Sequence, residues 1–63
     1  MPHTDVKVKL IGEDGNAFVI LGKVDKALVL AGYHNLARLY RDEVMLGDYD
    51  NLLRVTMKYV EVE

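Results

Sequence analysis

The two ends of the chain carry the same period-two pattern with opposite charges. Residues 6–10 read Val-Lys-Val-Lys-Leu, and residues 59–63 read Tyr-Val-Glu-Val-Glu. Alternation of apolar and charged residues is typical of a strand that buries one face. Because lysines point outward from one strand and glutamates from the other, each strand favours the other over a copy of itself. The pattern therefore predicts a small sheet that joins the beginning of the chain to its end.

Helical periodicity fills the sequence between these strands. Apolar residues recur at three- and four-residue spacing in three segments, at about 16–31, 36–46 and 48–57. Residues that favour helix ends separate these segments, with short polar caps before them (Asp14 or Asn16, Asn35, Asp48) and glycines after the first two (Gly32, Gly47). The first helix contains Gly22, which we expect to allow the close approach of a neighbouring element.

The order strand, helix, helix, helix, strand predicts a small α+β domain. An odd number of helices between two strands favours a parallel pair with a right-handed crossover, and antiparallel pairing stays open. We expect the helices to cover one face of the sheet and the charged side chains to be solvated on the other. The chain of 63 residues forms one domain, residues 1–63, with residues 1–4 frayed. The expected core includes Phe18, Leu28, Leu53 and Met57.

Composition and charge argue against several classes of function. The net charge of −2 disfavours bulk electrostatic binding to nucleic acid or anionic lipid. The chain has no cysteine, so we expect neither a thiolate metal site nor any cofactor. It has no serine nucleophile and no carboxylate pair in an evident apolar pocket, and we therefore expect no enzyme. Apolar runs are too short to span a bilayer, and no signal peptide precedes them, which favours a soluble cytoplasmic protein.

One apolar stretch exceeds what a helix with a single buried side needs. Val29 and Leu30 lie away from the core stripe that holds Leu28, on the side of Lys26 and Gly22. Two interpretations stay open: a contact with another chain, or burial by the other two helices. The first makes Val29, Leu30 and Lys26 a protein-interaction patch, used by a homodimer or by a different protein. This interpretation predicts a non-catalytic interaction or accessory module that self-associates.

Nucleic-acid binding is the alternative function. Residues 10–18 read Leu-Ile-Gly-Glu-Asp-Gly-Asn-Ala-Phe and resemble the G-x-x-G loop of KH domains, which holds single-stranded nucleic acid. The resemblance implies a site formed by the loop residues Gly12, Glu13, Asp14, Gly15 and Asn16. Two acids between the glycines depart from the family's pattern, because they repel phosphate. A strand also precedes this loop, where the family has a helix.

The first strand and the helical hairpin after it resemble a second nucleic-acid-binding family, the ribbon-helix-helix dimers. In that family, the strands of two copies pair, and their exposed side chains read DNA. The resemblance implies that Lys7 and Lys9 would face the groove. The acidic net charge and the second strand at residues 59–63 depart from that simple pattern, and Glu61 and Glu63 are well placed to pair with the lysines.

The chain as a whole resembles a group of short bacterial proteins of unknown function, many of them associated with mobile elements. The resemblance rests on residues 6–10 and 12–18, on the pairs 21–22, 52–53 and 59–60, and on Gly-Asp-Tyr-Asp at residues 47–50. It covers both ends of the chain better than the middle. Because no activity is established for that group, the resemblance implies a bacterial origin and no site.

Overall fold

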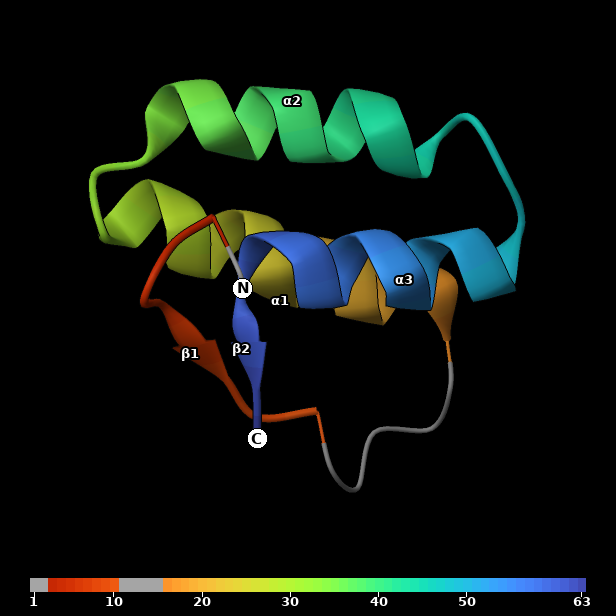
Figure 1. Ribbon diagram of the computed structural model, residues 1–63, viewed down its shortest axis with the longest axis horizontal. Coiled ribbons are helices and arrows are strands. Elements are labelled where there is room, and N and C mark those ends of the chain that lie inside the picture. Colours follow the sequence, from red (N-terminus) through yellow and green to blue (C-terminus); the bar gives the residue numbers. More distant parts are fainter. Residues whose placement is uncertain (1–2, 11–15) are drawn as a thin grey trace.

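The computed structural model describes residues 3–10 and 16–63. Two strands, β1 (Lys7–Val8) and β2 (Glu61–Val62), enclose three helices in the chain order of these described residues (Figure 1). The helices are α1 (Ala17–Leu30), α2 (His34–Val44) and α3 (Tyr49–Tyr59). The predicted α+β order of strand, three helices and strand is confirmed.

The two strands pair in parallel, as the number of intervening helices predicted. Lys7 lies opposite Glu61 and Val8 lies opposite Val62. The Glu61 amide donates to the Val6 carbonyl at 2.8 Å, which fixes this register. Lys7 and Glu61 are exposed and Val8 is buried, so the charges lie on the solvated side of the sheet. Opposite charges therefore meet across the pair, as the sequence of the two ends indicated.

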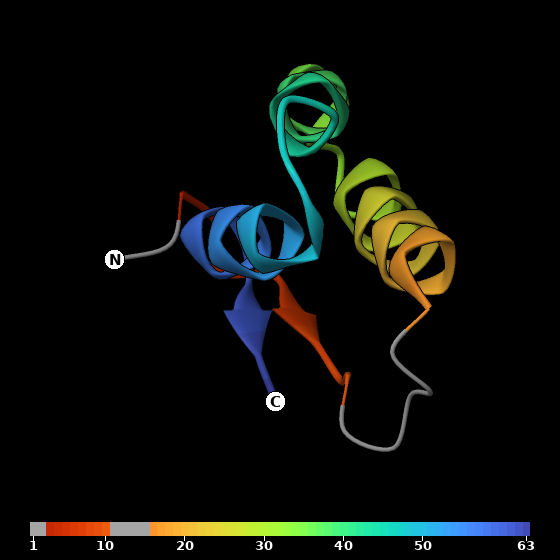
Figure 2. The same cartoon turned by 90° about the vertical axis from the view of Figure 1, so that its right-hand side faces the viewer.

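The helices lie on the other side of the sheet in two levels. α1 contacts β1 and α3 contacts β2, while α2 packs against α1 and α3 and makes no comparable contact with the strands. Figure 2, viewed nearly along the helices, shows this triangular arrangement with the sheet below it. The core fills the space inside the triangle. Its fully or almost fully buried helical residues are Ile20, Val24, Leu28, Ala37, Tyr40, Val44, Leu52, Val55, Thr56 and Tyr59.

Two of the four predicted core residues are wrong. Phe18 is 77% exposed and Met57 is 65% exposed, whereas Leu28 is fully buried and Leu53 is partly buried. The buried line of α1 is Ile20, Val24 and Leu28 instead of a line through Phe18. Each helix packs against two neighbours, so its buried side faces the middle of the triangle rather than a single partner.

Polar side chains begin two of the three helices. The side-chain oxygen of Asn16 accepts hydrogen bonds from the Phe18 and Val19 amides, and Asp48 accepts one from the Asn51 amide. These caps confirm the predictions for the first and third helices. The prediction that Asn35 caps the second helix is wrong.

The turn between α1 and α2 explains the missing cap. Gly32 has φ of +91°, the left-handed conformation that glycine adopts most readily. Its amide donates to the Val29 carbonyl at 3.0 Å, and the Tyr33 amide donates to the Leu28 carbonyl at 2.9 Å. This closing pattern leads the chain directly into α2 at His34, so Asn35 already lies inside the helix.

The beginning of the chain is held against the end of α3. The His3 amide donates to the Lys58 carbonyl at 2.8 Å, and the buried Thr4 hydroxyl donates to the Tyr59 carbonyl at 2.7 Å. The His3 ring also lies edge-on to the Tyr59 ring, with centroids 4.9 Å apart. His3 and Thr4, which we expected to fray, are instead bonded, while residues 1 and 2 lie outside the described residues.

Candidate interaction surface

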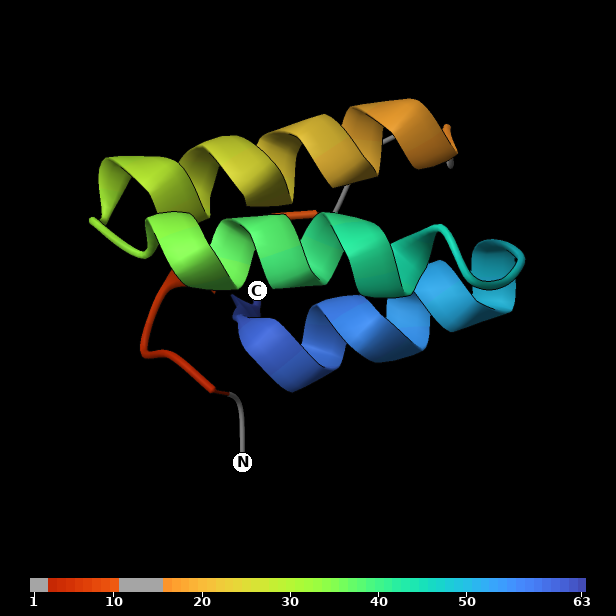
Figure 3. The ribbon, with the colours of Figure 1, turned by 90° about the horizontal axis from the view of Figure 1, so that it is seen from above.

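One side of α1 has no neighbouring element among the described residues. Opposite the buried line of α1 lie seven exposed residues, which we call the open face of α1: Phe18, Val19, Gly22, Lys23, Lys26, Val29 and Leu30. Figure 3 shows why this side is open, because α1 forms one edge of the helical layer, with α2 and α3 both to one side of it. The open face includes the three residues predicted as an interaction patch.

The apolar members of the open face are exposed to different degrees. Leu30 is 76% exposed and is largely open, whereas Val29 is 36% exposed and is partly covered. Phe18 at the other end of the helix is 77% exposed, and Val19 beside it is 42% exposed. Lys26 lies between the two ends and forms no ion pair with a described residue. The face therefore offers two apolar ends and a basic centre.

Gly22 occupies the middle of the open face. A Cβ atom built on Gly22 has no heavy atom within 4 Å apart from the backbone of its own helix. Among the described residues, no other element approaches Gly22 closely, contrary to the prediction. Glycine in a helix interior costs about 1 kcal/mol relative to alanine, and no contact with a described residue offsets that cost.

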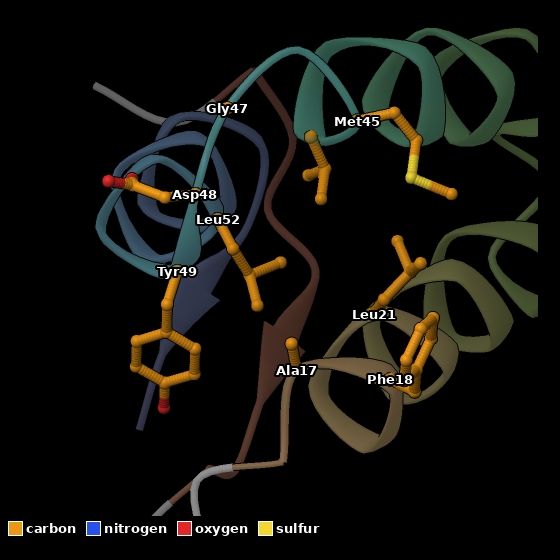
Figure 4. Close-up of a pocket in the computed structure, with 9 residues that line it drawn as sticks. Ala17, Phe18, Leu21, Met45, Gly47, Asp48, Tyr49 and Leu52 are labelled. Carbon is orange, nitrogen blue, oxygen red and sulfur yellow. The ribbon is translucent and has the colours of Figure 1, made fainter.

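A second apolar feature adjoins the first end of α1. A cavity of about 230 Å³ lies between the start of α1, the end of α2 and the start of α3 (Figure 4). Leu21, Met45 and Leu52 point toward this space, while the Asp48 carboxylate points away from it. Asp48 is committed to capping α3. The cavity thus has apolar walls, and Phe18 belongs both to its lining and to the open face.

One cluster of charged and polar side chains joins two helices. Lys58 Nζ lies 2.6 Å from one carboxylate oxygen of Glu43, and the Tyr59 hydroxyl donates to the other at 3.2 Å. The hydrogen bond from Lys58 is the main reason that the pKa of Glu43 lies below its ordinary value of 4.5. Burial is the main reason that the pKa of Tyr59 is raised. This cluster connects α2 to α3 and has a structural role.

Polar chemistry is sparse elsewhere in the part of the chain that the structure describes. Arg41 lies 3.6 Å from Asp25 and links α2 to α1. Within residues 3–10 and 16–63, no group of three or more His, Cys, Asp or Glu side chains is placed to hold a metal ion. The open face of α1 contains no carboxylate, so its chemistry is apolar and basic.

The residues of the nucleic-acid alternatives fall in different places. Gly12, Glu13, Asp14 and Gly15 lie outside the described residues. Asn16, the last residue of that loop, uses its side-chain oxygen to cap α1. Lys7 and Lys9 are exposed, and Lys7 faces Glu61 across the sheet. In this fold β1 pairs with β2 of the same chain, whereas a ribbon-type dimer pairs the strand with its copy.

The prediction from sequence missed four members of the open face. Phe18 was assigned to the core, and Val19, Gly22 and Lys23 were not assigned to the interaction patch. A signal for Phe18 was available, because residues 11 apart on a helix differ in direction by only about 20°. Phe18 therefore shares a line with Val29, and Val19 shares a line with Leu30.

No protein-family model, curated protein or solved structure matches this chain. In residues 3–10 and 16–63, every helix is too short or too polar to cross a membrane. The geometry of the open face is therefore the basis for assigning a function.

Proposed function

We propose that this protein is a non-catalytic interaction module that self-associates through the open face of α1. The observation that supports this most is that four exposed apolar side chains, Phe18, Val19, Val29 and Leu30, lie in two pairs on the same side of one helix. Single exposed apolar residues are ordinary, but several on one side of one element favour a binding surface. The uncontacted Gly22 at its centre leaves room for another backbone or side chain.

A non-catalytic role fits the way in which the polar groups are used. The Glu43, Lys58 and Tyr59 cluster and the Asp25–Arg41 pair connect helices. The cavity at the start of α1 is lined mainly by apolar side chains and lacks the convergent polar groups that orient and activate a substrate. Binding through an apolar helix face needs none of these groups.

The test is a charge-neutral change of the second apolar end. In the double variant Val29→Arg with Leu30→Glu, two exposed apolar residues become charged without altering the net charge of the protein. We expect the fold to remain, because both side chains are exposed. We expect self-association, measured by sedimentation equilibrium, to weaken at least tenfold, because two charged groups would have to be desolvated at the contact.

A matched control uses exposed apolar residues away from α1. Leu39 on α2 is 53% exposed and Met57 on α3 is 65% exposed. The variant Leu39→Arg with Met57→Glu is also charge-neutral and should associate like the unaltered protein. Equal association of both double variants would contradict the proposal. Unfolding of the Val29→Arg, Leu30→Glu variant would show that the two residues are core, which contradicts it equally.

A further inference from the structure

We infer that the occupant of the open face is the open face of a second copy, turned antiparallel about a two-fold axis near residue 24. This inference rests on the proposed self-association and specifies its geometry. It follows from the exposed apolar side chains of α1, which lie at matching distances on either side of residue 24. A surface that matches itself in this way favours an isologous dimer.

The two apolar ends lie at equal distances from the centre of α1. Phe18 and Val19 lie five or six residues before residue 24, and Val29 and Leu30 lie five or six residues after it. An antiparallel second copy turned about residue 24 therefore places its own second end against the first end of its neighbour. Each apolar end of one copy is then covered by the opposite apolar end of the other copy.

The lateral positions on the helix agree with the same pairing. Phe18 and Val29 are 11 residues apart and lie on one flank of the open face, while Val19 and Leu30 lie on the other. In an antiparallel two-fold pair, each flank meets the same flank of the second copy. Phe18 therefore contacts Val29 of the second copy, and Val19 contacts Leu30 of the second copy.

The centre of the face pairs a glycine with a long side chain. Gly22 lies two residues before residue 24 and Lys26 lies two residues after it, so each faces the other across the axis. The space at Gly22 is free of heavy atoms within 4 Å of a built Cβ. The aliphatic stem of Lys26 can lie across that space and carry its ammonium group to solvent. A parallel pair would instead leave both glycines facing each other and bring the two Lys26 side chains together.

Area and charge define how strong this dimer is. α1 has 14 residues, so a helix pair is about 21 Å long and roughly 10 Å wide. A footprint of that size is far below the ~800 Å² per partner of standard stable complexes, and the dimer is therefore weak. The Lys26 side chains of the two copies lie on the same flank, and their repulsion is screened by salt. The affinity of the dimer should therefore rise with salt concentration, whereas the affinity for an acidic partner would fall.

The test combines isotope-filtered NOE spectroscopy with variants at the centre of the face. A millimolar mixture of labelled and unlabelled protein should give intermolecular cross-peaks from the Phe18 ring to the Val29 methyls. Within one copy these groups are about 16 Å apart along the helix, too far for such a peak. Gly22→Gln should weaken association at least tenfold while keeping the fold, because the monomer has room for the side chain. Lys26→Gln should keep part of the aliphatic stem and remove the charge, and with it a salt-dependent gain in association of about threefold.

The possible negative results distinguish failure of the antiparallel geometry from failure of self-association itself. Cross-peaks between Phe18 rings of the two copies would overturn the antiparallel arrangement and leave self-association through α1 in place. Full association of Gly22→Gln, with association lost in the Val29→Arg, Leu30→Glu variant, would also overturn only the geometry. A protein that stays monomeric at millimolar concentration would overturn both this inference and the proposed function.

Discussion

Replacing Gly22 by alanine should stabilise the monomer. Glycine in a helix interior is about 0.8–1.0 kcal/mol less favourable than alanine. At Gly22 the added methyl group meets no heavy atom within 4 Å, so no steric cost offsets this gain. The entropy of unfolding is about 2.1 cal/mol/K per residue, or about 0.13 kcal/mol/K for a chain of this length. A gain of about 0.9 kcal/mol therefore raises Tm by roughly 7 °C.

The assay is thermal unfolding followed by circular dichroism at low micromolar concentration, where association does not contribute. Gly47→Ala is the matched control, because a Cβ at Gly47 would lie 2.6 Å from the Cβ of Asn51. The Asn51 side-chain amide donates to the Glu43 carbonyl at 3.2 Å, so its displacement also disturbs the end of α2. We expect Gly47→Ala to lose about 1–3 kcal/mol. An unchanged or lower Tm for Gly22→Ala would refute the claim that this face of α1 is unoccupied within the domain.

Two further predictions concern the polar groups of the core and of the α2–α3 contact. Tyr40→Phe should lose about 1–2 kcal/mol of unfolding free energy in urea titrations, because the buried hydroxyls of Tyr40 and Thr56 are bonded at 2.8 Å. Adding Thr56→Val should recover part of that loss, and strict additivity in the double-mutant cycle would argue against the bond. Glu43 has a folded-state pKa below 4.5, so its contribution is present above that pH and is lost as the pH falls through the folded-state pKa. Glu43→Gln should therefore flatten the decline of stability below pH 4.5, and an unaltered acid limb would contradict the role of the Lys58 bond.

The pairing of the chain ends could be predicted because it depends on short-range alternation. The period-two patterns located both strands, and their opposite charges indicated the partner. Lys7 facing Glu61 in a parallel pair is the outcome. The number of helices between the strands gave the parallel direction without any knowledge of packing.

The sides that the helices bury could not be read from periodicity alone. α1 is apolar over much of its circumference, so lines through Phe18 and through Ile20 both fit a helical stripe. Which line is buried depends on where α2 and α3 lie, and that is a tertiary property. Asn35 is a second case in which periodicity was not enough. The turn at Gly32 is so short that α2 begins at His34, and Asn35 therefore lies inside the helix instead of capping it.

Only part of the open face was accessible to the same reasoning. Val29 and Leu30, with Lys26 beside them, stood out because a helix with one buried side does not need apolar residues there, but the sequence left open whether they are buried or exposed. Phe18 was lost from that set because its size favoured a place in the core. The exposed Gly22 became informative only when the structure showed that no described residue outside the backbone of its own helix lies within 4 Å of a Cβ built there.

The most direct test of self-association through α1 is sedimentation equilibrium of the unaltered protein from micromolar to millimolar concentration, at low and at high salt. We expect the average mass to rise toward that of a dimer at the upper end of the range, and to rise earlier at high salt because lysine repulsion is screened. A monomer mass at every concentration and both salt levels would contradict self-association through the open face.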